Sequence, residues 1–250
     1  MQARAGLVAA LLVLYAGPAL AQRVTFHVGA DVREAVIYAP LAPPADRKLP
    51  VVLAFHGRGS NTTQFQYTFF DQSFREGVVV YLQGLSYGDG IPAWQLERGQ
   101  HGDRDLKLVD AVLASLRETY NVDDDRIYAM GFSNGAAFSY LLWAERPETF
   151  AAFAIVSGRA RTIRPTEPRP VFHVNGELDE AFTDQEATVR ISVAVNGSAA
   201  PEGRCGAGCT IAGAGTTAPV MSLVHSEGHV FPQQISPLIA AFFREHARRR

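Results

Sequence analysis

Mainly apolar segments alternate with amphipathic segments along the chain, and each predicts a strand or a helix. Six mainly apolar runs have the length of strands, at residues 49–55, 77–82, 127–130, 150–157, 170–174 and 220–225. Apolar side chains recur at helical spacing over residues 105–120 and again after residue 133. Strands that alternate with helices over short loops predict an α/β fold, with a mostly parallel central sheet and helices on both faces.

Shorter elements complete this pattern at the start of the chain. Residues 23–28 and 34–38 predict two strands joined by a turn, and residues 62–70 predict a helix capped near Asn61. No internal repeat or interdomain linker interrupts the pattern, so residues 22–250 are expected to form a single domain.

The first 21 residues predict a leader rather than part of the fold. Arg4 gives a positive start, residues 6–15 are an apolar core, and Ala19-Leu20-Ala21 is a cleavage signal of the A-x-A type. We therefore expect a signal peptide over residues 1–21 and a secreted or periplasmic mature protein without a membrane span. An uncleaved anchor is the alternative, although the apolar core is short for a membrane span.

The composition is that of an ordinary globular protein, with 47% hydrophobic and 19% charged residues among 250. The formal net charge is −2. A charge so close to zero gives no reason to expect nucleic acid as a partner. The sequence does not determine the oligomeric state.

The pentapeptide 131–135 reads Gly-Phe-Ser-Asn-Gly, and it stands between a predicted strand and a predicted helix. A G-x-S-x-G motif in this context forms a sharp turn that exposes the serine hydroxyl as a nucleophile. Gly131 and Gly135 leave room for the strained backbone of Ser133. The amide of Asn134, at the start of the helix, is expected to face a developing oxyanion.

A second glycine-containing loop, His-Gly-Arg-Gly at residues 56–59, follows a buried strand. Such a loop can turn backbone amides toward the edge of the sheet where the serine is expected. The amide of Arg58 is our preferred second oxyanion donor, and Gly57 and Gly59 are the alternatives. A long loop over residues 83–102 holds Trp94, which we assign to the substrate-binding wall, with a core position as an equal alternative.

A serine nucleophile needs a base and an acid, which in this architecture follow it along the chain. Asp179 lies in the loop after the predicted strand at 170–174 and is the preferred acid, with Glu177 as the alternative. A loop carboxylate that only caps the following helix is the structural alternative.

His229 lies in the loop after the last predicted strand and is the preferred base. Gly228 gives that loop the freedom to bring the imidazole to Ser133. His225 and His173 lie within strands, where a core position is expected. The remaining histidines considered fall outside any loop cluster: His27, His101 and His246.

The two cysteines, Cys205 and Cys209, stand four residues apart. In an exported protein a local disulfide is the preferred interpretation, and it would brace the segment before the last strand. A zinc site would need further ligands, and none stands nearby in the sequence.

With these residues placed, the chain resembles the exported α/β-hydrolases known as polyhydroxybutyrate depolymerases and feruloyl esterases. The resemblance depends on His56-Gly57, on Tyr120-Asn-Val-Asp123 leading into Arg126-Ile-Tyr-Ala, on the Gly-Phe-Ser-Asn-Gly turn, on Asn175-Gly-x-x-Asp179 and on Gly228-His229. It implies an α/β-hydrolase fold in which Ser133, Asp179 and His229 are nucleophile, acid and base.

The resemblance implies a serine carboxylic ester hydrolase that forms an acyl-enzyme and requires no metal or organic cofactor. Feruloyl-type, acetyl or short hydroxyalkanoate esters are the expected substrates, as small molecules or soluble oligomers. Two alternatives stay open at this point. One is a serine peptidase or acyltransferase with the same triad, and the other is a non-catalytic binding protein of the same fold.

Overall fold

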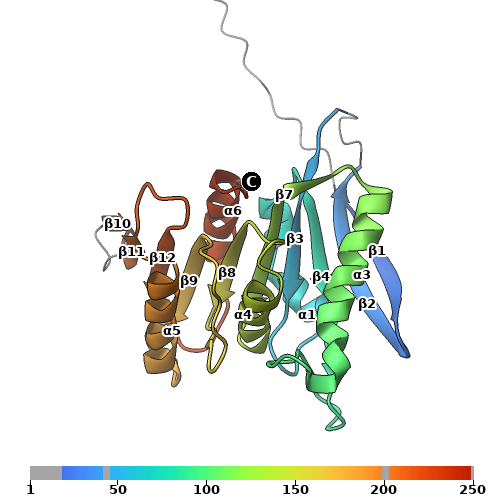
Figure 1. Ribbon diagram of the computed structural model, residues 1–250, viewed down its shortest axis with the longest axis horizontal. Coiled ribbons are helices and arrows are strands. Elements are labelled where there is room, and N and C mark those ends of the chain that lie inside the picture. The colour runs from blue at the N-terminus through green and yellow to red at the C-terminus, as the bar shows by residue number, and fades with distance from the viewer. Residues whose placement is uncertain (1–18, 42–45, 199–202, 249–250) are drawn as a thin grey trace, which may run out of the picture.

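The computed structural model describes residues 19–41, 46–198 and 203–248. One ten-stranded sheet forms its centre (Figure 1). Its strands are β1 (Ala19–Val28), β2 (Asp31–Pro40), β3 (Leu49–Phe55), β4 (Val78–Leu82), β7 (Val122–Phe132), β8 (Ala152–Val156), β9 (Val171–Gly176), β10 (Gly203–Gly206), β11 (Cys209–Ala212) and β12 (Val220–His225). A separate hairpin pairs β5 (Leu85–Ser86) with β6 (Pro92–Ala93).

The strand order is β1-β2-β4-β3-β7-β8-β9-β12-β11-β10. The strands from β4 to β12 in this order run parallel, and antiparallel strands flank them at both ends. The prediction of a mostly parallel central sheet is therefore confirmed. Because parallel strands end at the same edge, the loops after β3, β7, β9 and β12 meet at the lower edge of the sheet in Figure 1.

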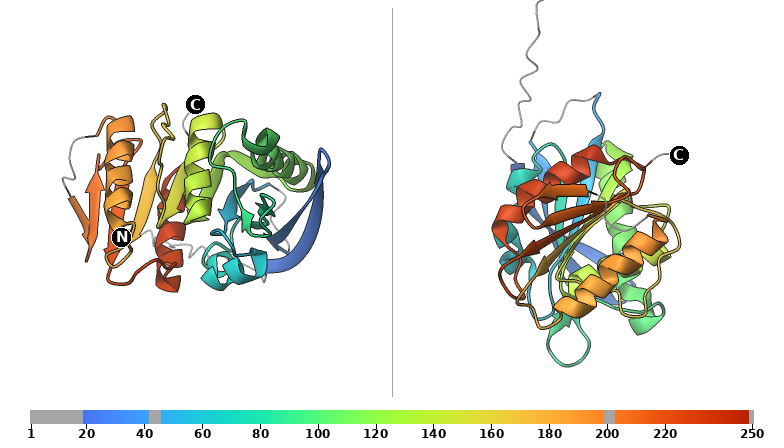
Figure 2. Two further views of the ribbon diagram at one scale, coloured as in Figure 1. Left: turned by 90° about the horizontal axis from the view of Figure 1, so that it is seen from below. Right: turned by 90° about the vertical axis from the view of Figure 1, so that its left-hand side faces the viewer.

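Helices cover both faces of the sheet. They are α1 (Thr62–Phe65), α2 (Phe70–Ser73), α3 (Arg104–Thr119), α4 (Asn134–Glu145), α5 (Phe182–Val195) and α6 (Ser236–Glu245). In the right-hand view of Figure 2 the orange helix α5 and the red helix α6 lie on opposite sides of the sheet. Within the described residues, no helix combines the length and hydropathy that crossing a membrane would require.

Strand β3 shows why a continuous apolar run belongs at the centre of this fold. All seven of its residues are buried. Val51, Leu53 and Phe55 belong to the core under α3 and α4, whereas Val52 and Ala54 belong to the core under α1, α2 and α6. Successive side chains of a strand point to opposite faces, so a strand covered on both faces needs apolar residues throughout.

Several elements differ from the predicted ones, whereas the signal peptide over residues 1–21 stays a prediction. Strand β1 begins at Ala19, so the last three residues of the predicted leader pair with β2 opposite Tyr38–Pro40. The helix expected over residues 62–70 is broken, because Phe69 adopts a left-handed conformation with φ 51° between two short helical segments. The strands β10 and β11 were not anticipated. Residues 1–18 of the predicted signal peptide lie outside the described residues.

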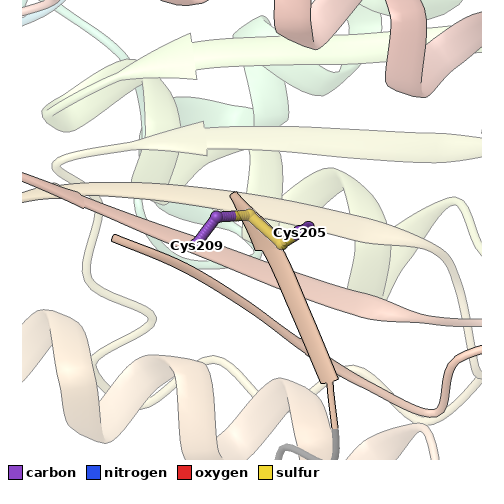
Figure 3. The surroundings of a disulfide bond; sticks show 2 residues. All are labelled: Cys205 and Cys209. Atoms are coloured by element: carbon purple, nitrogen blue, oxygen red, sulfur yellow. A yellow bond between two sulfur atoms is a disulfide. The ribbon is translucent and has the colours of Figure 1, made fainter. Parts of the chain in front are cut away.

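The predicted disulfide is present. Cys205 on β10 bonds Cys209 on β11, and their Cα atoms are 5.0 Å apart (Figure 3). The bond closes a hairpin at the edge of the sheet, where β11 pairs with β12. It therefore braces the segment before the last strand, as expected from the position of the two cysteines.

A buried polar cluster joins three elements beneath the carboxyl edge. The ring of His173 on β9 lies with its Nε2 3.1 Å from the hydroxyl of Tyr140 on α4 and 3.0 Å from the hydroxyl of Ser192 on α5. Burial lowers the pKa of His173 to about 3. The folded protein therefore keeps this imidazole neutral at a pH where an exposed histidine is protonated.

This shift predicts a loss of stability in acid. Between about pH 6.5 and pH 3 the unfolded chain binds a proton at His173 that the folded chain does not, so the free energy of unfolding falls as pH falls. The full pKa shift of His173 corresponds to about 4–5 kcal/mol of the free energy of unfolding. His173→Gln removes the titration, so the stability advantage of the wild-type protein over this variant should shrink by about that amount across the range. Urea unfolding at several pH values measures it, and parallel curves for the two proteins would refute the prediction.

Candidate active site

Ser133 lies at the turn between β7 and α4, in the backbone conformation that the motif predicts. Its φ is 54° and its ψ is −114°, a strained combination for a residue with a side chain. A Cβ on Gly131 would lie 2.3 Å from the carbonyl oxygen of Gly135, and a Cβ on Gly135 would lie 2.2 Å from that of Phe55. Both glycines are therefore required for the turn.

The structure brings together the three side chains predicted from sequence. The Nε2 atom of His229 lies 2.8 Å from the Oγ of Ser133, and the Nδ1 of His229 lies 2.6 Å from the Oδ2 of Asp179. These distances join residues separated by 96 and 50 positions in the chain. A carboxylate accepts only, so the Nδ1 of His229 carries the hydrogen and its Nε2 is free to accept the serine proton.

Backbone contacts fix the loop of the acid against the loop of the base. The amides of Glu177 and Leu178 donate to the carbonyls of His225 and Glu227, at 2.8 and 3.1 Å. A Cβ on Gly176 would lie 2.2 Å from the carbonyl oxygen of Gly228, so the two loops approach more closely there than any other residue would allow. The relative position of Asp179 and His229 is therefore set by the ends of β9 and β12, which are neighbours in the sheet.

Asp179 is buried, and its carboxylate is held by three donors. Its Oδ1 accepts from the amide of Ala181 at 2.9 Å, and its Oδ2 accepts from Gln185 at 2.7 Å as well as from His229. Burial alone raises the pKa of this carboxyl, but the hydrogen bonds from Ala181, Gln185 and His229 outweigh it and lower the pKa below its ordinary value. Glu177, the alternative acid, is exposed, and the acid that bonds His229 is Asp179.

The other candidate histidines serve elsewhere. His173 lies in the buried cluster with Tyr140 and Ser192. The Nδ1 of His225, at the end of β12, accepts from the amide of Glu227 at 3.3 Å. Neither ring is hydrogen-bonded to Ser133, so among the described residues His229 stays the candidate base.

The loop after β3 is ordered by the ring of His56. Its Nε2 accepts from the amide of Gly84 at 3.0 Å, so its Nδ1 carries the hydrogen and donates to the carbonyl of Gly57 at 2.8 Å. Burial lowers the pKa of His56 and so favours this neutral form. The ring therefore holds the carbonyl of Gly57 inward, and a Cβ on Gly57 would lie 3.4 Å from the Cβ of Ser133.

The hydrogen bonds of this loop narrow the choice of a second oxyanion donor. The amide of Gly59 donates to the carbonyl of Pro92 at 2.8 Å, so it is already engaged. The guanidinium of Arg58 pairs with Asp89 on the turn of the β5–β6 hairpin. These contacts leave the amides of Gly57 and Arg58 as the candidates beside Ser133.

The assignment of Trp94 to the substrate-binding wall was wrong. Its side chain has no exposed surface, stacks on Phe138 with ring centroids 5.5 Å apart, and donates from Nε1 to the carbonyl of His56 at 2.8 Å. The backbone of Trp94, however, bonds the side chain of Asn134. The amide of Trp94 donates to the Oδ1 of Asn134 at 2.7 Å, and the Nδ2 of Asn134 donates to the carbonyl of Trp94 at 3.2 Å. Trp94 thus ties the long loop to the serine turn from within the core.

A buried ion pair, which the sequence did not suggest, anchors the same loop. Arg33 on β2 and Asp105 on α3 lie 2.7 Å apart, and neither side chain is exposed. The second carboxylate oxygen of Asp105 accepts from the amide of Gln95 at 2.8 Å. The backbone of the loop at residues 94–95 is therefore fixed on one side by Asn134 and on the other by Asp105.

Comparison with known proteins places this arrangement in a family. The model of the Esterase family, described as "Putative esterase", matches residues 31–208, which is more than half of the chain. The chain belongs to the Esterase family. The match includes the serine turn and the loop of Asp179 and ends before the loop of His229.

Two curated relatives of this Esterase-family chain are also named as esterases, and one solved structure matches its fold. A bifunctional acetylxylan esterase/xylanase of Neocallimastix patriciarum is 30% identical over 62% of the chain, and a probable feruloyl esterase C of Aspergillus flavus is 24% identical over 50%. The chain spans 22% and 46% of the length of these relatives. An acetyl xylan esterase of Aspergillus awamori matches the fold with a TM-score of 0.68 at 16% identity, over 89% of this chain and 99% of that one.

The prediction of an α/β-hydrolase of the esterase type is therefore confirmed at the level of family and fold. The feruloyl esterase part of the resemblance has a counterpart among the relatives of this Esterase-family protein. The polyhydroxybutyrate depolymerase part and the export of the chain stay predictions.

Proposed function

We propose that this protein is an exported serine esterase that hydrolyses carboxylic esters through Ser133, His229 and Asp179. The observation that supports this most strongly is the unbroken chain of hydrogen bonds from Ser133 through His229 to Asp179, built on a strained turn that exposes the hydroxyl. The turn itself requires neither a histidine nor a buried carboxylate next to the serine.

In the proposed mechanism, the Nε2 of His229 takes the proton of Ser133 as its Oγ attacks the ester carbonyl. Asp179 stays ionised, holds the ring in the required tautomer and stabilises the imidazolium. The amides of Asn134 and Arg58 are proposed to hold the tetrahedral oxyanion, each worth about 10²–10³ in rate. His229 then protonates the leaving alcohol, and water repeats the cycle on the acyl-enzyme.

Exposed apolar side chains adjoin the proposed site on both sides and favour an uncharged ester. Leu178 precedes the acid and is 72% exposed, and Val230 follows the base and is 38% exposed. Ile91, on the β5–β6 hairpin, is 38% exposed and would lie 3.7 Å from a Cβ on Gly59 of the oxyanion loop. Together with relatives named acetylxylan and feruloyl esterases, these residues favour acetyl and feruloyl-type esters, with short hydroxyalkanoate esters as further candidates.

A substrate panel on the purified protein distinguishes this proposal from its alternatives. We expect hydrolysis of p-nitrophenyl acetate, methyl ferulate and acetylated xylan, and no comparable cleavage of an aminoacyl p-nitroanilide. Faster cleavage of the anilide would favour a peptidase, and acyl transfer to an added alcohol in place of hydrolysis would favour an acyltransferase. Absence of turnover on every ester would favour the non-catalytic binding protein. A hydroxybutyrate oligomer in the same panel tests the remaining part of the resemblance.

A further inference from the structure

Gln185 lies directly behind the candidate triad, although it is not part of the triad. It belongs to the second turn of α5, six positions after Asp179, and has no exposed surface. Its Nε2 donates to the Oδ2 of Asp179 at 2.7 Å. This is the same oxygen that accepts from His229.

The orientation of the Gln185 amide is fixed by chemistry. An ionised carboxylate only accepts hydrogen bonds, so the NH₂ group of Gln185, and not its oxygen, must face Asp179. The Oε1 of Gln185 is buried and has no hydrogen-bond partner among the described residues. A buried oxygen without a partner lowers stability, so stability alone does not explain a glutamine at this position.

The geometry points to Gln185 as a positioning residue for the acid of the triad, an inference that depends on the proposed function. The terminal torsion of an aspartate side chain is soft, so one hydrogen bond to Oδ1 does not fix where Oδ2 points. The amide of Ala181 holds Oδ1 and Gln185 holds Oδ2, each from one end of the same turn. The carboxylate plane is thereby locked in the orientation that bonds the Nδ1 of His229.

Replacement of Gln185 by leucine removes the donor at nearly constant volume. We expect kcat for ester hydrolysis to fall by about 10- to 100-fold with little change in KM, because a small misplacement of a catalytic group has an effect of this size. We expect the melting temperature to fall only modestly, because loss of the hydrogen bond to the carboxylate is partly offset by loss of the unpaired buried oxygen. A purely structural role predicts lower stability with unchanged turnover per folded molecule.

Gln185→Glu gives a pH signature that a structural role would not produce. A buried glutamate beside Asp179 has a raised pKa, and its protonated form donates to Oδ2 as the glutamine does. As pH rises this proton is lost, and two carboxylates then face each other. We therefore expect the ratio of kcat for this variant to kcat for the wild-type protein to fall as pH rises from 5 to 9. A ratio that does not change with pH would overturn the inference.

Thr188→Val is the matched control. Thr188 lies one turn further along the same buried face of α5, accepts from the amide of Ala160 at 3.2 Å and donates to the carbonyl of Asp184 at 2.8 Å. These two hydrogen bonds of its hydroxyl do not involve the triad, so its replacement should lower stability and leave kcat per active site unchanged.

Titration of active sites with a fluorophosphonate separates failure of this inference from failure of the proposed function. Wild-type protein that takes up no probe would reject the proposed function, whatever the Gln185 variants do. Wild-type protein that labels normally, with Gln185→Leu equal to it in kcat, would reject only the role of Gln185.

Discussion

Ser133→Ala is expected to lower kcat for ester hydrolysis by about 10⁴- to 10⁶-fold, because it removes the hydroxyl that bonds the Nε2 of His229. Alanine keeps the Cβ of serine, so the strained backbone at φ 54° is unchanged and the melting temperature should stay nearly the same. The measurement is steady-state hydrolysis of p-nitrophenyl acetate by protein purified away from contaminating esterases.

Ser139→Ala is the control for this substitution. Ser139 lies in α4, the helix that begins after Ser133, and it is buried. Its hydroxyl donates to the carbonyl of Gly135 at 3.0 Å, a hydrogen bond outside the triad. Its replacement should leave kcat largely unchanged. Turnover by Ser133→Ala equal to that of the wild-type protein would exclude Ser133 as the nucleophile.

Asp179→Asn is expected to lower kcat by about 10⁴-fold through the tautomer of His229. If the new NH₂ group faces His229, the Nδ1 of the ring must accept, and its Nε2 then carries a hydrogen toward Ser133 and cannot act as a base. If the NH₂ group faces the amide of Ala181 instead, two donors meet and the negative charge behind the imidazolium is missing. Neither orientation restores the native set of hydrogen bonds.

The control for the loss of charge is Asp184→Asn. Asp184 lies in the first turn of α5, the helix that follows Asp179, and its exposed side chain pairs with Arg159 at 3.3 Å. We expect its kcat to match that of the wild-type protein. An Asp179→Asn protein with kcat within a few-fold of this control would show that Asp179 is not the acid.

Much of the architecture could be predicted because it depends on burial, which is visible in the sequence. Strands β3 and β12 occupy the predicted ranges Leu49–Phe55 and Val220–His225. The meeting of Ser133, Asp179 and His229 was also predictable, since each follows a strand whose carboxyl end reaches the same edge of the sheet. The glycines at 131 and 135 confirmed the turn, because backbone atoms occupy the space of any Cβ there.

The remaining features depend on contacts between distant residues, which no local pattern encodes. An aromatic residue in a long loop, such as Trp94, is typical of a pocket wall. The ring of Trp94 instead packs in the core against Phe55 and Phe138. The helix after Asn61 has suitable residues, yet Phe69 leaves the helical region of backbone angles. Gln185 was missed because only the turn after Asp179 brings it to the carboxylate.

Mapping the site of a fluorophosphonate adduct on the folded protein shows directly whether Ser133 is the nucleophile. We predict one adduct, on the peptide that carries Ser133, formed as ester hydrolysis is lost and greatly slowed in a His229→Ala variant. An adduct on another residue, or continued ester hydrolysis after Ser133 is fully labelled, would contradict this prediction.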